Sequence, residues 1–289
     1  MTMLLAPMKD ASTCFISFSG GRTSAYMTHK LLTEGRDLFD RYIVLFANTG
    51  REHPKTLEFI RNCDEHFGFG TIWVEAIVNP KHGKGSEHRV VDFQTASRDG
   101  EPFEQAIRKH GVFNVSRPDC TRILKREPME HYLKAQGFKP RKIATAIGIR
   151  ADEKRRVSTA DARNIIYPLV NRWPVDKQDV LDWWEDQPFD LEIEEFQGNC
   201  LGCYKKSRRK QFLQMDEDPS VFDWIDRMEK TYGMVKSKNG EPHRWFRNNL
   251  STEQMREEHE RIAGYYRRQM QFDFDVGGCS ESCEMFESE

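Results

Sequence analysis

The sequence contains no long apolar run. None of its hydrophobic stretches approaches the roughly 20 residues that a membrane-spanning helix needs. The first ten residues, MTMLLAPMKD, hold an apolar stretch that is too short for a secretory signal peptide, and they carry no cleavage-site pattern. We therefore expect a cytoplasmic protein with no membrane partner.

The chain also lacks a marked excess of either charge. Its 289 residues include 44 Lys and Arg against 46 Asp and Glu, which gives a net charge of −2. Any basic surface for a nucleic acid must therefore be local. Hydrophobic residues make up 38% of the chain and charged residues 31%, which is typical of a folded chain with a polar surface. The length suffices for one large α/β domain, with or without a smaller appendage.

Cysteine is scarce and unevenly spaced. An odd number of cysteines in a reducing compartment does not indicate a disulfide framework, so buried thiols and metal ligands are the alternatives. Cys14 and Cys63 lie in apolar strand-like and helix-like contexts, and we expect them to be buried thiols. The seven cysteines are Cys14, Cys63, Cys120, Cys200, Cys203, Cys279 and Cys283.

Strand and helix patterns alternate in the first half of the chain. This alternation favours an α/β fold, a Rossmann-like parallel sheet with helices on both faces. Ligands of such sheets bind beyond the carboxyl ends of the strands. We predict strands at 14–18, 41–47, 71–78 and 141–149, and helices at 23–35 and 53–68.

The remaining segments divide into an irregular region and a helical part. Residues 78–119 give no regular pattern and are interpreted as a lid or substrate loop. Asp176 is the predicted cap of one helix, and Ser251 and Gln254 have the spacing of a capping box at the start of another. We place an α/β domain at 1–200 and a helical region with an acidic, cysteine-containing tail at 201–289. The predicted helices of the second half span 176–187, 203–215, 219–233 and 251–270.

The hexapeptide SGGRTS follows the first predicted strand. Its glycines permit a tight turn, its hydroxyls are donors, and the helix that follows directs a partial positive charge at an anion. It matches neither the Walker pattern nor G-x-G-x-x-G, and an ordinary strand–turn–helix corner is the alternative. The candidate phosphate-binding residues are Ser19, Gly20, Gly21, Arg22, Thr23 and Ser24.

Five motifs in order resemble the PAPS and APS reductases of the adenine-nucleotide α-hydrolase-like superfamily, a group that also includes ATP pyrophosphatases and tRNA thiolation enzymes. The loop resembles their SGGxxS element. Four later segments resemble further elements of the family, so that the resemblance spans roughly residues 13–207. These segments are LFANTGREHPKTLEF, CTRILKREPMEHYL, IGIRADEKRR and IIYPLVNRWPVDKQDVLDWW.

The resemblance implies further nucleotide-binding positions. Asn48 stands where the family commonly has Asp, and Arg22 where Asp or Lys is usual. Arg150 is also a catalytic candidate because it follows a strand end. A solvated charge run is the alternative for the Arg150–Arg156 segment, and an exposed helix position for Lys125. The implied residues are Asn48, Thr49, Gly50, Glu52, Lys125, Gly148, Arg150 and Arg156.

Three cysteines are candidate metal ligands. Cys200 and Cys203 form a C-x-x-C, whose thiolates suit one metal centre, and Cys120 opens a helix-like segment. APS reductases carry a Cys-Cys pair and a later C-x-x-C around a 4Fe–4S cluster, but here Asp119 replaces the first cysteine of the pair. Cys283 is the proposed fourth ligand, Cys279 could serve instead, or one iron stays open. Zinc is the rival metal.

The acidic tail lacks the E-C-G-[LI]-H nucleophile motif of the reductases. Cys279, flanked by glycines, and Cys283 are the candidate nucleophiles. A ligand role or an inert end are the alternatives. The basic run 205–210 is a candidate contact for tRNA or DNA, and a solvated helix face paired with nearby acids is its alternative.

Three hypotheses follow. In the first, the protein is an iron–sulfur enzyme: ATP activates a substrate as an adenylate, pyrophosphate leaves, and sulfur is transferred to a nucleic-acid base. In the second, the protein reduces PAPS or APS to sulfite. In the third, it is a non-catalytic, metal-stapled module that binds a nucleotide or nucleic acid. The first two require a sulfur donor or a reductant as a partner; Mg²⁺ and an oligomeric state are compatible with all three.

Overall fold

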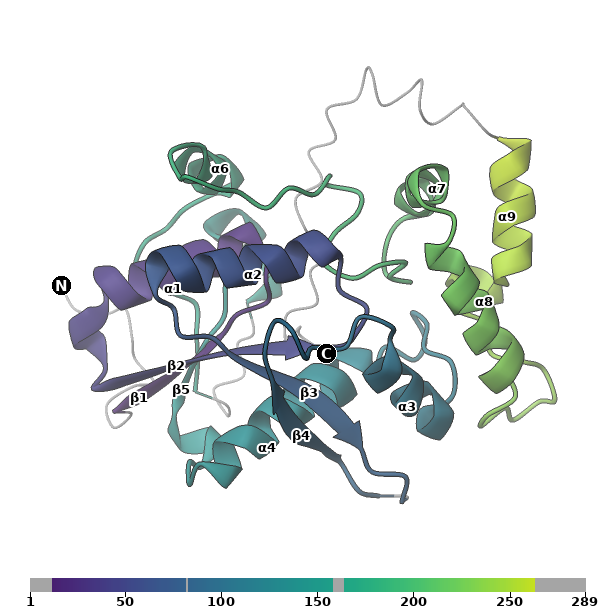
Figure 1. The fold of residues 1–289 in the computed structure, drawn as a ribbon, viewed down its shortest axis with the longest axis horizontal. Helices are drawn as coiled ribbons and strands as arrows, with labels where there is room; N and C mark the ends of the chain where they lie inside the picture. The colour runs from purple at the N-terminus through teal and green to yellow at the C-terminus, as the bar shows by residue number, and fades with distance from the viewer. Residues whose placement is uncertain (1–11, 82, 158–163, 263–289) are drawn as a thin grey trace.

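The computed structural model describes residues 12–81, 83–157 and 164–262. It contains a six-stranded sheet in the order β4-β3-β2-β1-β5-β6 (Figure 1). All neighbouring strands are parallel except β4, which runs antiparallel to β3. The α/β fold predicted from the sequence is therefore confirmed. The strands are β1 (Thr13–Ser17), β2 (Arg41–Asn48), β3 (Ile72–Val78), β4 (Ser86–Val91), β5 (Ala144–Ala146) and β6 (Ile165–Ile166).

The strand order reverses at β1. The chain passes from β1 to β2 and β3 on one side, and later to β5 and β6 on the other. Phe15 pairs with Ile43 of β2 and with Thr145 of β5, which fixes the register on both sides. Such a reversal opens a crevice at the carboxyl ends of the central strands. The glycine loop follows β1 and therefore lies at this crevice.

Helices cover both faces of the sheet. Figure 1 shows α1 (Arg22–Thr33) and α2 (Pro54–Phe67) along one face and α4 (Glu127–Ala135) across the other. Alternate residues of β1 serve the two layers: Ile16 packs in the cluster of α1 and α2, whereas Phe15 packs in the cluster of α4. Because both faces are buried, β1 is an almost continuous apolar run.

Helix boundaries follow the capping signals. His53 caps α2 by accepting from the Lys55 N–H at 3.1 Å, Pro54 occupies the first turn, and Gly68 ends the helix in the left-handed conformation. Asp176 caps α6 (Lys177–Glu185), as predicted. The shorter segments are η1 (Arg36–Leu38), the π-helical η2 (Arg122–Arg126), η3 (Pro140–Lys142), η4 (Ala151–Arg156) and α5 (Pro168–Asn171).

The C-terminal helices share a core with the first half of the chain. Phe103 of α3 (Glu101–His110) packs edge-on against Trp224 of α8 (Val221–Tyr232) and is tilted against Trp245. The predicted capping box of Ser251 and Gln254 is confirmed, while residues 263–270 of that predicted helix lie outside the described residues. The boundary at residue 200 stays a prediction. These helices are α7 (Arg208–Glu217), α8 (Val221–Tyr232), η6 (Arg247–Asn249) and α9 (Thr252–Arg261).

The prediction that residues 78–119 lack regular structure is wrong. This region contains β4 and α3 (Glu101–His110). β4 is an edge strand with mostly half-exposed or exposed residues, so its sequence carries little apolar alternation. The helix α3 is short and bounded by Gly100 and Gly111, both at positive φ, which in the sequence resemble loop residues.

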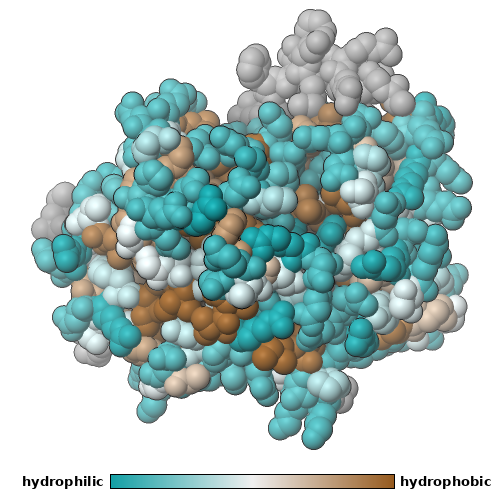
Figure 2. Space-filling view, viewed as in Figure 1, coloured by the Kyte–Doolittle hydropathy of each residue, from teal (hydrophilic) through white to brown (hydrophobic). Residues whose placement is uncertain are grey.

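Hydrophilic residues cover most of the face drawn in Figure 2, and hydrophobic residues show between them in several patches, the largest in the lower part of the view. No helix in the part of the chain that the structure describes is long and apolar enough to cross a bilayer.

Candidate functional site

The glycine loop is closed by its own hydroxyl groups. Ser19 Oγ donates to Ser24 Oγ at 2.9 Å, and Ser24 Oγ donates to the Gly21 carbonyl at 2.9 Å. Gly20 has a φ of 81°, and a Cβ there would lie 2.8 Å from Thr56 Cγ2. Glycine is therefore required at position 20 both for its conformation and for the close approach of α2.

The N-terminus of α1 is open to an anion. Gly21 is its N-cap residue and supplies no side-chain cap, and the first turn carries no acidic residue. The N–H groups of that turn have no intrahelical acceptor, and the helix dipole adds a partial positive charge. This end of α1 thus has the donors and the polarity that a phosphate or sulfate group needs.

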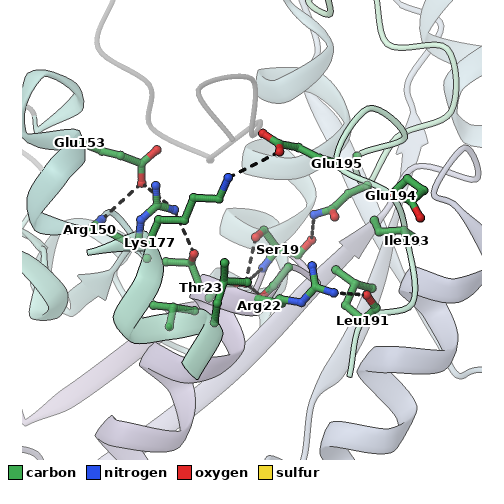
Figure 3. Close-up of a pocket in the computed structure, with 17 residues that line it drawn as sticks. Ser19, Arg22, Thr23, Arg150, Glu153, Lys177, Leu191, Ile193, Glu194 and Glu195 are labelled. Atoms are coloured by element: carbon green, nitrogen blue, oxygen red, sulfur yellow. Dashed lines mark hydrogen bonds and ion pairs between the residues drawn. The ribbon is translucent and has the colours of Figure 1, made fainter. Parts of the chain in front are cut away.

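A cavity of about 250 Å³ lies against this loop (Figure 3). Its walls come from the loop, from the segment after β5, from α6, and from the irregular chain before Cys200. Apolar side chains of α6 and of that chain face the polar loop, which suits a ligand with both apolar and anionic parts. The lining residues include Ser19, Arg22, Ser24, Gly148, Arg150, Glu153, Lys177, Val180, Leu191, Ile193, Glu194 and Asn199.

Arg150 is a buried cation at this cavity. Its residue surface is 4% exposed. The guanidinium binds the Asp152 carboxylate at 2.9 and 3.0 Å, and Nη1 lies 3.3 Å from Thr23 Oγ1 of the loop. Burial opposes the charge on Asp152, but the hydrogen bonds and charge of Arg150 outweigh it and lower the pKa of Asp152. Arg150 therefore lies beside the loop, and its role in binding or catalysis stays a prediction.

Two further predicted residues, Gly148 and Arg156, lie near the glycine loop and its cavity. A Cβ on Gly148 would lie 3.0 Å from Ser24 Cα, so a side chain there would require the segment after β5 or the start of α1 to shift. Arg156 does not line the cavity; its Nη1 donates to Glu153 Oε1 at 2.6 Å, and Glu153 does line the cavity.

Arg22 is held by an acidic partner. Its Nε and Nη2 bind the Asp190 carboxylate at 2.7 and 2.8 Å, and Nη2 also contacts the Leu191 carbonyl oxygen. Figure 3 shows the Arg22 guanidinium directed toward Leu191. A contact between Arg22 and a phosphate stays a prediction, and in this arrangement Nε and Nη2 are already engaged by Asp190.

Asn48 belongs to a buried polar network. Its Nδ2 donates to Glu75 Oε1 at 2.6 Å and to the Ser97 carbonyl at 2.8 Å, and its Oδ1 accepts from the Gly50 N–H. Glu75 is fully buried and also accepts from Arg89 Nε at 2.7 Å. An aspartate at position 48 would place a second carboxylate against Glu75. This neighbour explains the departure from the family's usual Asp.

Glu52 is buried behind the same strand end. It accepts from the Thr49 N–H at 2.8 Å and from Thr49 Oγ1 at 2.9 Å. Burial raises the pKa of Glu52, while the positive charge of Lys125 and the hydrogen bonds from Thr49 oppose that rise. Thr49, Glu52 and Lys125 therefore form a charge-compensated group, and none of them lines the 250 Å³ cavity.

Backbone pairing brings the C-x-x-C segment to this group. The His53 N–H donates to the Asn199 carbonyl at 2.7 Å, and the Leu201 N–H donates to the Arg51 carbonyl at 2.8 Å. Cys200 Sγ consequently lies 3.8 Å from Glu52 Oε1. A second cavity, of about 20 Å³, is lined by Cys120, Cys200 and Cys203, together with Arg51, Lys125 and aromatic residues.

This second cavity does not fit a metal centre as the side chains are placed. About 20 Å³ is room for roughly one water molecule. Cys120 Sγ lies 3.0 Å from the Tyr204 hydroxyl. Within residues 12–81, 83–157 and 164–262, no three His, Cys, Asp or Glu side chains are grouped so as to hold a metal ion. Cys279 and Cys283 lie outside the described residues.

The basic run 205–210 does not present one uniform face. Lys206 is buried, and its Nζ donates to the Cys200 carbonyl at 3.1 Å and to the Gln197 carbonyl. Ser207 caps α7, and Arg208 pairs with Glu258 at 2.7 Å. Part of the run thus holds the cysteine segment in place.

The sequence analysis missed several residues of the site, among them Lys177, Glu195, Asn199 and Asp190. Lys177 Nζ lies 3.5 Å from Glu195 Oε2, and the two side chains reach toward each other at the cavity in Figure 3. Asn199 Nδ2 donates to the Ser19 carbonyl at 3.0 Å, and Asp190 holds Arg22. Lys177 lies within the family-like segment IIYPLVNRWPVDKQDVLDWW and Asn199 stands next to Cys200, whereas no motif marks Asp190 or Glu195.

The chain is similar to known proteins over most of its length. The family model described as phosphoadenosine phosphosulfate reductase domain matches residues 13–166, more than half of the chain. An uncharacterized nin region protein, ORF290, of Escherichia phage lambda is 33% identical over 279 residues, 94% of each chain. A crystal structure of phosphoadenylyl-sulfate (PAPS) reductase from Candida auris, a phosphate complex, matches with a TM-score of 0.37 and 17% identity over 60% of this chain and 71% of that one.

Proposed function

From the premise that this chain belongs to the phosphoadenosine phosphosulfate reductase family, we propose that its glycine loop binds the phosphate or sulfate groups of an adenine nucleotide. The observation that carries this proposal is the uncapped N-terminus of α1, which faces a 250 Å³ cavity beside the buried Arg150. The apolar wall opposite the loop supports a place for the less polar part of the nucleotide.

We propose adenylation as the reaction. An oxygen of the acceptor attacks the α-phosphorus of ATP, a new P–O bond forms, the bond to the β-phosphate oxygen breaks, and pyrophosphate leaves. Negative charge accumulates on the departing group, where the α1 N–H groups and Arg150 stabilise it without reorganisation. Thr23, which contacts Arg150, keeps the guanidinium next to the loop. Asp152 holds the other edge of the same group.

In the second step, a sulfur-donor partner supplies sulfur as a persulfide on Cys279 or Cys283, and its outer sulfur attacks the activated carbon of the acceptor. A C–S bond forms, the bond to the adenylate oxygen breaks and AMP leaves; the other of the two thiols then releases the thiolated acceptor as a disulfide forms. A nucleic-acid base is the proposed acceptor. Family membership and the convergence of Cys120, Cys200 and Cys203 on one cavity support this step. Cys279 or Cys283 is the proposed nucleophile. A 4Fe–4S centre, with zinc as the rival, is part of the proposal, but no step above runs through it, because the described side chains do not form a metal site.

The second candidate is reduction of PAPS or APS to sulfite, which the description of the matching family model favours. In that reaction a thiol attacks the sulfate sulfur, the nucleotide phosphate leaves, and a second thiol releases sulfite as a disulfide forms. The same loop would hold the nucleotide phosphates.

One experiment separates the candidates. The full-length protein is incubated with Mg²⁺ and either ATP plus RNA or DNA, or PAPS plus thioredoxin, and pyrophosphate and sulfite are measured. Acceptor-dependent pyrophosphate supports adenylation, and sulfite supports the reductase. Arg150→Ala is expected to lower either activity about 100-fold or more, as loss of one preorganised charge-stabilising donor does. Arg155→Ala, an exposed neighbour, is the matched control. If the protein bound the nucleotide but formed neither pyrophosphate nor sulfite, both candidate reactions would be contradicted and the non-catalytic binding module would be supported.

Anaerobic purification tests the metal centre. Iron together with acid-labile sulfide, lost in the Cys200→Ser variant, would support the cluster. Stoichiometric zinc, or no metal at all, would contradict it.

A further inference from the structure

A third cavity, polar and open, is formed by residues distant in sequence from the glycine loop. It shares no lining residue with the two cavities described above. It has a volume of about 900 Å³ and is formed by the turn after α3 and by the loops that join α8 to α9. We call it the basic groove and define it by Arg117, Lys236, Lys238, His243 and Arg247, which all line it.

Cations dominate the basic groove. Arg117, Lys236, Lys238 and Arg247 carry permanent charges, and Glu241 is the one acidic residue in its lining. Within the part of the chain that the structure describes, none of the four cations forms an ion pair. Arg117 and Arg247 donate to the backbone carbonyls of His110 and Lys205, and the negative charge of Asp119 also acts on Arg117.

The positive charge of the groove contributes to the lowered pKa of the neighbouring His110. His110, at the end of α3, has its pKa lowered to about 4, first by burial and then by the positive charges of Lys236, Lys109 and Arg122. Lys236 also contributes to the lowered pKa of Lys109, after burial. An anion in the groove would relieve this accumulation of positive charge.

The groove offers hydrogen-bond donors but no exposed aromatic platform. Asn239, Asn248 and Asn249 line it and are exposed, whereas Phe246 in its floor is 1% exposed and stacks on Phe222. Phe246 is therefore closed to a base, and the half-buried His243 is the one other ring in the lining. Spread cations and amides fit a chain of phosphate groups better than a single nucleotide.

We propose that the basic groove binds the phosphodiester backbone of a nucleic acid. The groove spreads its charges along two loops, which matches the repeated charges of a polyanion. The proposal does not depend on nucleotide chemistry at the glycine loop, since no residue is shared.

The test is fluorescence anisotropy of the full-length protein with a labelled DNA duplex and a labelled RNA hairpin over a salt series. The variant combines Lys236→Asn with Lys238→Ala; asparagine suits position 236, where φ is 59°. We expect binding of at least one probe, and we expect the variant to reduce the salt slope by about two, one for each lost phosphate contact. The preferred probe identifies DNA or RNA as the source of the phosphates.

The control is the double variant Lys134→Ala, Lys139→Ala, which removes the same charge from the end of α4 and the loop after it, where both lysines are exposed. Equal binding by the two double variants, no binding of either probe at low salt, or equal competition by polyglutamate would each overturn the proposal. Circular dichroism confirms that both variants are folded, and ATP binding, measured separately, reports on the glycine loop alone.

Discussion

At the scale of single residues, the candidate site combines positions that a motif reveals with positions that only a neighbour explains. Gly20 and Gly148 are glycines because a Cβ would meet Thr56 or Ser24. Asn48 is different, since its amide donates to the carboxylate of Glu75, which is 27 positions away in the chain. The substitution of the family's Asp is therefore accounted for by Glu75.

This explanation predicts the cost of restoring the acid. Asn48→Asp removes the donor to buried Glu75 and adds a second carboxylate, so we expect the free energy of unfolding to fall by about 3 kcal/mol. Urea unfolding measures it. Asn62→Asp, the same change on the partly exposed surface of α2, is the control and should change stability by less than about 0.5 kcal/mol. If Asn48→Asp and Asn62→Asp lowered the free energy of unfolding by similar amounts, the explanation of Asn48 by its contact with Glu75 would be wrong.

A second prediction concerns Arg22 and rests on the proposed nucleotide site. Asp190→Ala frees the guanidinium for a phosphate, so nucleotide affinity is expected to rise, by at most about fivefold because an exposed ion pair contributes only about 0–1 kcal/mol. Isothermal titration with ATP measures the change. Glu192→Ala, which removes an acid from the same segment that pairs with Lys55 instead, is the control. Unchanged or weaker binding would mean that Arg22 only anchors the segment.

At the scale of elements, what was predictable depended on local signals. The strands and helices with buried, periodic residues and clear caps, from β1 to α2 and at α6, were found within a few residues. β4 and α3 were not, because an exposed edge strand and a short helix between glycines carry little periodicity. The pairing of the Cys200 segment with Arg51–His53 was also hidden, since a backbone bridge between distant loops leaves no pattern in either.

The contact of β4 with α4 supports a prediction of pH dependence. His88 Nδ1 lies 2.6 Å from His131 Nδ1. Burial, and then the neighbouring His131, lower the pKa of His88. The unfolded chain therefore binds a proton that the folded chain does not, so stability is complete above the ordinary histidine pKa of about 6.5 and declines as the pH falls below it. His88→Phe should reduce the slope of stability against pH in urea unfolding between about pH 7 and 5. If the slope were unchanged in the variant, groups other than His88 would cause the pH dependence of stability.

At the scale of the whole molecule, the helical part and the sheet domain are joined by aromatic packing rather than by a linker. Trp224 contacts Phe103 of α3 and Trp245 of the loop before α9, and the Arg51 guanidinium lies 4.5 Å from its ring centroid. Arg51 borders the NTG segment and pairs through its backbone with Leu201. The core that holds the cysteine cavity is thus built from both halves of the chain.

We therefore expect the two halves to unfold together. Trp224→Ala should lower the free energy of unfolding by about 3–5 kcal/mol, the usual cost of removing a buried aromatic side chain, and a chain ending at residue 200 should fail to fold because Phe103 and its neighbours lose their cover. Coincident urea transitions by tryptophan fluorescence and far-UV circular dichroism would show one cooperative unit. Trp173→Ala, at a partly buried tryptophan that packs against the other cluster, gauges the effect of a tryptophan change elsewhere. Two separate transitions, or a stable 1–200 fragment, would instead support the predicted boundary at residue 200 and would make the cysteine cavity an interface between independent domains.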